Sequence, residues 1–159
     1  MIRKSNVRLT LCLSALSLLL AFIWGNSLLP GHLSGAFSDW FKGILKCIFP
    51  FLFSGTPGES GGGLLRKLAH FTEFAALGTC LCWLYGMIST TQTRQMVLSL
   101  ICGILAASVD ETIQRFVPGR HGCLTDVCID TAGVTAGILL FTVAYLIFKN
   151  KNQYWEESK

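Results

Sequence analysis

The sequence predicts an all-α fold: a polytopic membrane helix bundle with four transmembrane helices and a short interfacial or re-entrant helix in the first long loop. Composition is the first reason, because 52% of the 159 residues are hydrophobic and only 14% are charged, whereas soluble domains carry about 25% charged residues. The second reason is that four apolar runs each approach the length of about 20 residues that a membrane-crossing helix needs. We expect a single domain over residues 1–159.

The first predicted span covers about residues 7–24. Basic residues precede it, and Trp24 ends it. A basic start before an apolar run is also typical of a cleavable signal peptide, but no small-x-small cleavage site follows this run. We therefore interpret it as a membrane helix with its basic end in the cytoplasm and Trp24 at the membrane–water interface.

The connection after the first span has a different composition. Residues 39–53 are apolar but short for a membrane crossing, and Lys42, Lys46 and Pro50 interrupt them. Their apolar side chains fall at helical spacing, which predicts a helix that lies in the headgroup region or re-enters the membrane. A helix packed against the bundle explains the same pattern. Residues 54–63 have the Gly-rich composition of a flexible linker.

Three further spans are predicted at about residues 64–88, 96–117 and 124–148. With four spans, both termini lie on the same side of the membrane. We expect a multi-pass protein of the cell membrane with both termini in the cytoplasm. In that orientation seven basic residues lie inside and six lie outside, which is a small positive-inside bias.

Polar residues gather at one end of this predicted bundle, where the second and fourth spans begin and the third ends. The candidate binding residues are Lys67, His70, Glu73, Asp110, Glu111, Gln114, Arg120, Asp126 and Asp130. A charge at the centre of a bilayer costs roughly 2.5–3.5 kcal/mol on insertion scales, so ionisable residues that converge inside spans indicate a functional site.

The helical rise of 1.5 Å per residue predicts two layers of these side chains, about 4–6 Å and about 9–12 Å below the helix ends. The shallower layer contains His70, Gln114 and Asp126. The deeper layer contains Glu73, Asp110 and Asp130. Because three different helices contribute to both layers, we expect the polar side chains to share one pocket.

Structural explanations remain open for single residues in this group. Asp126 suits the dipole of the helix that it begins, and Arg120 suits a structural salt-bridge network. His70 alone is more typical of a packing residue than of a ligand or base. Gly133 and Gly137 have the spacing that lets two helices approach closely. The convergence of acids and an imidazole from three spans favours a binding site over a purely structural cluster.

Two other classes of site are not indicated. The formal charge of +4 is spread over tails and loops without a basic stripe, so we expect no nucleic-acid partner. The seven cysteines form no pair of pairs of the kind that binds zinc, and their odd number argues against a disulfide framework. The sequence identifies no cofactor.

Three motifs in order resemble the VanZ-like family of bacterial membrane proteins. They are Lys67-x-x-His70-Phe71-x-Glu73-Phe74, Asp110-Glu111-x-x-Gln114-x-Phe116-x-Pro118-Gly119-Arg120, and Asp126-x-x-x-Asp130-x-x-Gly133-x-x-x-Gly137. The Asn26-Ser27 pair after the first span also fits, so the resemblance covers nearly the whole chain. Asp130 stands where many members carry Asn. The resemblance implies a small multi-span protein, and the family's founding member is associated with resistance to the glycopeptide teicoplanin.

The first functional hypothesis is a binding protein. Its expected partner is a membrane lipid or cell-wall precursor headgroup, or a divalent cation, in a polar cleft at the outer leaflet. Lys67 and Arg120 would bind phosphate, and the acids would bind a cation or hydroxyl groups. Altered presentation of cell-envelope precursors would then contribute to glycopeptide resistance.

The second hypothesis is an intramembrane enzyme that acts on a lipid-linked substrate. Its catalytic candidates are His70 as general base, oriented by Glu73 or Asp110, with Asp126 or Asp130 as acid or metal ligand. The third hypothesis is a proton path or transporter, since acids and His in spans can relay protons. It is the least favoured, because the charged residues are confined to one end of the bundle.

Overall fold

The computed structural model describes residues 2–31, 61–120 and 122–157. Over these residues the chain forms four α-helices and no strand: α1 (Ile2–Leu28), α3 (Gly61–Ile88), α4 (Gln92–Arg115) and α5 (Leu124–Glu157). The predicted all-α class is thereby confirmed. The short helix predicted at residues 39–53 lies outside the described residues.

The four helices are long and apolar enough to cross a membrane, over Asn6–Leu28, Arg66–Ile88, Gln92–Arg115 and Leu124–Lys151. The prediction of a multi-pass membrane protein is confirmed, and the helix bounds differ from those expected by a few residues. Helix α4 begins earlier because the Thr91 hydroxyl accepts a hydrogen bond from the backbone N–H of Arg94 at 3.3 Å, which caps the helix. It ends at Arg115, where the N–H of Phe116 turns back to the carbonyl of Ile113 at 3.0 Å.

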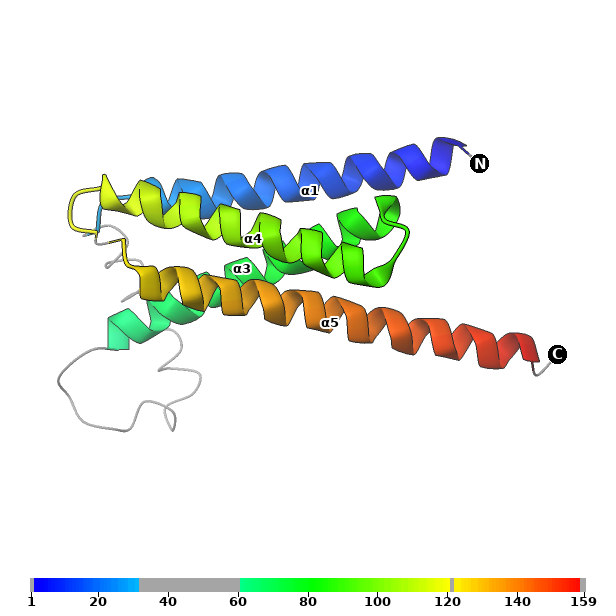
Figure 1. The fold of residues 1–159 in the computed structure, drawn as a ribbon. Helices are drawn as coiled ribbons and strands as arrows, with labels where there is room; N and C mark the ends of the chain where they lie inside the picture. Colours follow the sequence, from blue (N-terminus) through cyan, green and yellow to red (C-terminus); the bar gives the residue numbers. More distant parts are fainter. Residues whose placement is uncertain (1, 32–60, 121, 158–159) are drawn as a thin grey trace, which may run out of the picture.

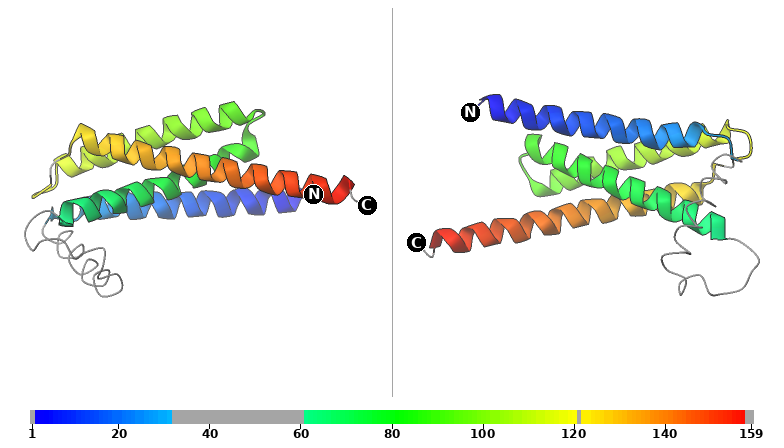
Figure 2. Two further views of the ribbon diagram at one scale, coloured as in Figure 1. Left: turned by 90° about the horizontal axis from the view of Figure 1, so that it is seen from below. Right: turned by 180° about the vertical axis from the view of Figure 1, so that it is seen from behind.

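Consecutive helices run in opposite directions, so α1 and α4 end where α3 and α5 begin (Figure 1). Helix α1 begins and α5 ends at the opposite end of the bundle, as the two further views in Figure 2 also show. The start of α1 and the end of α5 therefore lie at the same end of the bundle. That this end faces the cytoplasm stays a prediction.

Helices α3 and α5 pack with their backbones close together. A Cβ atom at Gly133 would collide with the carbonyl oxygen of Phe71, and one at Gly137 would collide with the carbonyl oxygen of Ala75. Small residues at such a crossing allow the van der Waals contact that holds membrane helices together, because lipid provides no hydrophobic driving force between them. The packing role predicted for these two glycines is confirmed.

Apolar side chains fill the centre of the bundle and also cover its outside. The buried core consists of Ile23, Phe74, Leu77, Leu81, Cys82, Ala107, Val134 and Ile138. On the outside, Leu18 is 72% exposed and Phe148 is 68% exposed, as expected of a surface that contacts acyl chains. The buried charged side chains lie instead toward one end, where α3 and α5 begin.

Candidate functional site

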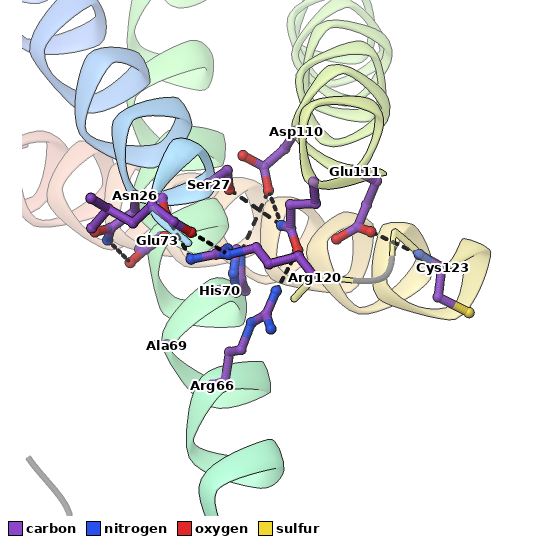
Figure 3. Close-up of polar contacts among 12 residues, drawn as sticks. Asn26, Ser27, Arg66, Ala69, His70, Glu73, Asp110, Glu111, Arg120 and Cys123 are labelled. Atoms are coloured by element: carbon purple, nitrogen blue, oxygen red, sulfur yellow. Dashed lines mark hydrogen bonds and ion pairs between the residues drawn. The ribbon is translucent and has the colours of Figure 1, made fainter. Parts of the chain in front are cut away.

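Buried and half-buried polar side chains meet at the end of the bundle where α1 and α4 end. Figure 3 shows several of them pointing toward one another from α1, α3, α4 and the turn after α4. We call this set the polar cluster: Asn26, Ser27, Arg66, Lys67, His70, Glu73, Asp110, Glu111, Gln114, Arg120, Asp126 and Asp130. Within it Ser27, Asp110, Glu111, Gln114, Arg120 and Asp130 are buried.

His70 on α3, Asp110 on α4 and Asp130 on α5 form the innermost part of the cluster. One nitrogen or oxygen atom from each lies within 4.8 Å of the other two, and Nδ1 of His70 is 3.7 Å from Oδ2 of Asp110. Asp110 and Asp130 are 0% and 1% exposed. Four polar atoms of this group have no hydrogen-bond partner among the described residues: Oδ1 of Asp110, both carboxylate oxygens of Asp130 and Nδ1 of His70.

Gln114 holds Asp110 in its place one helical turn away. Its amide nitrogen donates to Oδ2 of Asp110 at 2.8 Å and to the hydroxyl of Ser27 at 3.2 Å. Its amide oxygen accepts a hydrogen bond from the guanidinium of Arg66. Since both donor hydrogens and the acceptor are used, this buried amide connects α1, α3 and α4 around the carboxylate.

Arg120 closes the end of α1. Its guanidinium donates to the carbonyl oxygen of Asn26 at 2.7 Å and to that of Leu29 at 2.9 Å. Helices end with unpaired carbonyl groups and a partial negative charge, which a buried guanidinium satisfies. Burial lowers the pKa of Arg120, and the neighbouring charge of Arg66 lowers it further, but an arginine side chain stays protonated in proteins.

The same turn is fixed to α1 by backbone contacts. The N–H of Gly31 donates to the carbonyl oxygen of Pro118 at 3.1 Å. Gly119 has a positive φ of 76°, which a residue without a side chain adopts without strain. A Cβ atom at Gly31 would collide with the backbone of Gly119, so the close approach requires glycine at position 31 and the positive φ favours glycine at position 119.

Glu73 lies beside α1, and its carboxylate accepts a hydrogen bond of 3.4 Å from the side-chain amide of Asn26. The sequence offered Glu73 and Asp110 as alternative partners of His70. In the structure, Oδ2 of Asp110 lies 3.7 Å from Nδ1 of His70. The carboxylate of Glu73 instead accepts its hydrogen bond from Asn26. Of these two carboxylates, Asp110 is therefore the one found beside the imidazole, at a distance longer than a hydrogen bond.

The rim of the cluster is more exposed. Lys67 and Asp126 form an ion pair of 3.7 Å, with side chains that are 50% and 29% exposed. Pairs of this kind contribute about 0–1 kcal/mol, so this one leaves the ammonium free to exchange partners. The carboxylate of Glu111 accepts a hydrogen bond from the backbone N–H of Cys123 at 2.9 Å, which ties α4 to the start of α5.

A cavity of about 120 Å³ opens at this rim. Its lining comes from α3, α4 and α5: Arg66, Lys67, His70, Glu111, Gln114, Asp126, Ile129 and Asp130. Six of the nine predicted binding residues are in this lining. The lining does not include Glu73, Asp110 or Arg120. Asp110 lies behind the cavity wall, next to His70, and the side chains of Glu73 and Arg120 face α1.

The predicted layers describe the cluster in part. The structure groups His70, which was expected in the shallower layer, with Asp110 and Asp130, which were expected in the deeper one. The sequence reasoning also missed Asn26, Ser27 and Arg66 as members of the cluster. For the first two, the signal was a polar pair directly after an apolar span; for Arg66, it was a cation one residue before Lys67.

Comparison with known proteins assigns the chain to a family. No curated protein and no solved structure matches it. The sequence matches the VanZ/LLP1 family over residues 11–149, a range that begins inside α1 and reaches far into α5, so it contains all three motifs. This match confirms the resemblance noted above and covers most of the 159 residues. The protein is therefore a member of the VanZ/LLP1 family.

Proposed function

We propose that this membrane protein binds the phosphate headgroup of a membrane lipid or of a lipid-linked cell-envelope precursor in the cavity at the start of α3 and α5. The observation that carries the proposal is the pair of adjacent cations, Arg66 and Lys67, in the lining of a cavity that opens at one end of the bundle. A phosphate is a dianion or monoanion with several acceptor oxygens, so it suits two neighbouring cationic donors.

Both cations keep donors for a ligand. Arg66 has five N–H donors, and its recorded side-chain hydrogen bond is the one to Gln114. Lys67 is half exposed, and its pairing with Asp126 at 3.7 Å is loose. Arg120, which the sequence suggested as a phosphate ligand, is buried outside the cavity lining and donates to two carbonyl groups, one at the end of α1 and one in the turn after it. Arg66 therefore takes the place proposed for Arg120.

The size of the cavity supports a small polar occupant. Pockets that enclose drug-sized ligands measure about 300–1,000 Å³, several times the 120 Å³ found between α3, α4 and α5. A headgroup phosphate would occupy this space while its acyl or prenyl chains stayed in the bilayer against the apolar outside of the bundle. A glycopeptide is much too large to enter.

A contribution to teicoplanin resistance would therefore be indirect. A protein that holds the phosphate of a cell-wall precursor changes how that precursor is presented at the outer leaflet, and so changes drug access. The expected result is that expression in a susceptible host raises the inhibitory concentration of teicoplanin, and that R66Q/K67Q removes this increase.

Native mass spectrometry of the detergent-purified protein tests the binding itself. The protein is titrated with phosphatidylglycerol, with undecaprenyl phosphate and with diacylglycerol, which lacks phosphate. We expect adducts with the two phosphate lipids at concentrations at least tenfold below those needed for diacylglycerol. In the R66Q/K67Q variant this preference should disappear.

The matched control is R94Q/K149Q, which removes the same two charges from exposed positions toward the opposite end of the bundle. It should retain the preference for phosphate lipids. Equal adduct formation with all three lipids in the unsubstituted protein, or equal loss in both double variants, would contradict the proposal.

The second candidate function is an intramembrane enzyme that hydrolyses the phosphoanhydride bond of a lipid-linked pyrophosphate. The observation that favours it is the buried carboxylate of Asp110, 3.7 Å from Nδ1 of His70, because shortening of this distance to a hydrogen bond when substrate binds would orient the imidazole as a general base. Incubation with undecaprenyl pyrophosphate distinguishes the two functions. Release of inorganic phosphate that is lost in H70Q would support the enzyme, and stoichiometric binding without release would support the binding protein.

A further inference from the structure

We propose that His70, Asp110 and Asp130 bind one divalent transition-metal ion at the floor of the cavity. The metal site stands on the geometry of these three side chains. Its role rests on the proposed function: the ion would coordinate an oxygen of the same headgroup phosphate that Arg66 and Lys67 bind.

The first argument is the convergence of three donor atoms from three helices. One nitrogen or oxygen atom from each side chain lies within 4.8 Å of the other two. Ligand atoms that share a metal at about 2.0–2.2 Å lie at most about 4.4 Å apart. Small side-chain rotations, which move the donors by about half an ångström to 1 Å, would bring all three to one ion.

The second argument is that the acids lack partners where they are buried. Asp110 and Asp130 are 0% and 1% exposed. Within the described part of the chain, three of their four carboxylate oxygens accept no hydrogen bond. Buried charges in proteins are paired or coordinate metals, because an isolated buried carboxylate is strongly destabilising. A bound cation satisfies these oxygens at once.

The third argument is the charge of the polar cluster. It contains five carboxylates, Glu73, Asp110, Glu111, Asp126 and Asp130, against three cationic side chains, Arg66, Lys67 and Arg120. With His70 neutral, the formal charge is −2. A divalent cation brings the cluster to neutrality, which favours its burial in a bilayer.

The donor set also indicates the kind of metal. An imidazole nitrogen with two carboxylates suits zinc, manganese or iron, whereas calcium and magnesium prefer oxygen ligands alone. His70 and Asp130 line the cavity, and Asp110 lies behind it. Three protein ligands leave at least one coordination position, and that position would face the cavity and the phosphate.

Metal analysis of the purified protein tests the site. The protein is stripped with a chelator, dialysed against Zn²⁺ or Mg²⁺, and measured by inductively coupled plasma mass spectrometry. We expect one Zn²⁺ per chain and at least tenfold less Mg²⁺. The variants H70Q, D110N and D130N should each reduce the bound Zn²⁺ at least tenfold. D126N is the matched control, since Asp126 lines the same cavity but lies outside the three-residue group, and it should keep the ion.

Thermal unfolding in detergent provides a second measurement in case a variant is poorly folded. Zn²⁺ should raise the Tm of the unsubstituted protein and of D126N by several degrees, and should leave the Tm of H70Q unchanged. No Zn²⁺ uptake by the unsubstituted protein would overturn the proposal. An equal loss of bound Zn²⁺ in D126N and D130N would also overturn the proposal, because the ion would then not distinguish the three-residue group from the other acids of the cavity.

Zn²⁺ binding and phosphate-lipid binding are measured separately, so the metal site and the proposed function can be tested independently. R66Q/K67Q should retain Zn²⁺ while losing its preference for phosphate lipids. Zn²⁺ binding without any lipid preference in the unsubstituted protein would leave the metal site standing and remove the phosphate function. Lipid preference without Zn²⁺ binding would do the reverse.

Discussion

Arg120 donates a hydrogen bond of 2.7 Å to the carbonyl oxygen of Asn26, so the turn that follows α4 fastens the end of α1. This contact assigns Arg120 to the stability of the bundle. It also explains why a cation can be buried at this depth, since the last carbonyl groups of a helix carry a partial negative charge.

We expect R120Q to lower the free energy of unfolding by about 3–6 kcal/mol, because hydrogen bonds to charged groups contribute about 1.5–3 kcal/mol each and two are lost. The free energy of unfolding of R120K should lie between those of R120Q and the unsubstituted protein, because an ammonium keeps the charge but not the forked geometry of the guanidinium. Unfolding in detergent followed by circular dichroism measures this. R94Q, an exposed change at the opposite end, should stay within about 0.5 kcal/mol. Equal stability of R120Q and R94Q would refute the assignment.

The crossing of α3 and α5 gives the second prediction. G137A places a methyl group against the carbonyl oxygen of Ala75, so the helices must separate. Overpacking of this kind costs about 1–3 kcal/mol, and the same unfolding experiment should report it. The control is G25A, where nothing lies within 4 Å of the added atom. It should be neutral or stabilising by about 0.5–1 kcal/mol, since Ala favours helix more than Gly.

The third prediction concerns pH. The hydroxyl of Thr125 donates to Sγ of Cys123 at 3.1 Å, which lowers the pKa of this exposed thiol below 9.0. A lowered pKa means that the reactive thiolate forms at lower pH. Alkylation of Cys123 by iodoacetamide should therefore rise with pH earlier than in T125A, with a several-fold slower rate for T125A near pH 7.5 and equal rates near pH 10. Superimposable pH profiles would show that the hydroxyl has no effect on the thiol.

The fourth prediction tests the orientation in the membrane. If both termini are cytoplasmic, Cys123 faces the outside of the cell. A membrane-impermeant maleimide should then label intact cells that express a C47S/C128S variant, in which the remaining cysteines besides Cys123 lie within the spans. C47S/C123S/C128S is the control for background labelling. Labelling that requires permeabilised cells would reverse the predicted orientation.

Much of the fold could be predicted because lipid imposes strong requirements on sequence. Long apolar runs locate the spans, and counting residues from their ends places His70, Asp110 and Asp130 at one end of the bundle. Gly133 and Gly137 were predicted as a packing face because their spacing repeats once per turn. These inferences depend on distance along a helix, which the sequence records directly.

The rotation of each helix about its axis could not be predicted in the same way. Whether Glu73 faces His70 or α1 depends on how α3 packs, and the structure pairs it with Asn26. Likewise, the hydrogen-bond partners of Arg120 depend on a turn that brings Gly31 and Gly119 together. Arg66 was not predicted as a member of the polar cluster, because a cation at the start of a span is usually a lipid-facing anchor.

The contact between Gly133 and Phe71 has a consequence for ligand selection. His70 directly precedes Phe71, and Asp130 lies one turn before Gly133, so the backbone contact sets the gap across which imidazole and carboxylate face each other. A residue that has no side chain and does not line the cavity thus contributes to its width. Exchanging polar groups around the pocket would alter its chemistry while its aperture stayed constant, and enlarging Gly133 would alter its aperture while every polar group was retained.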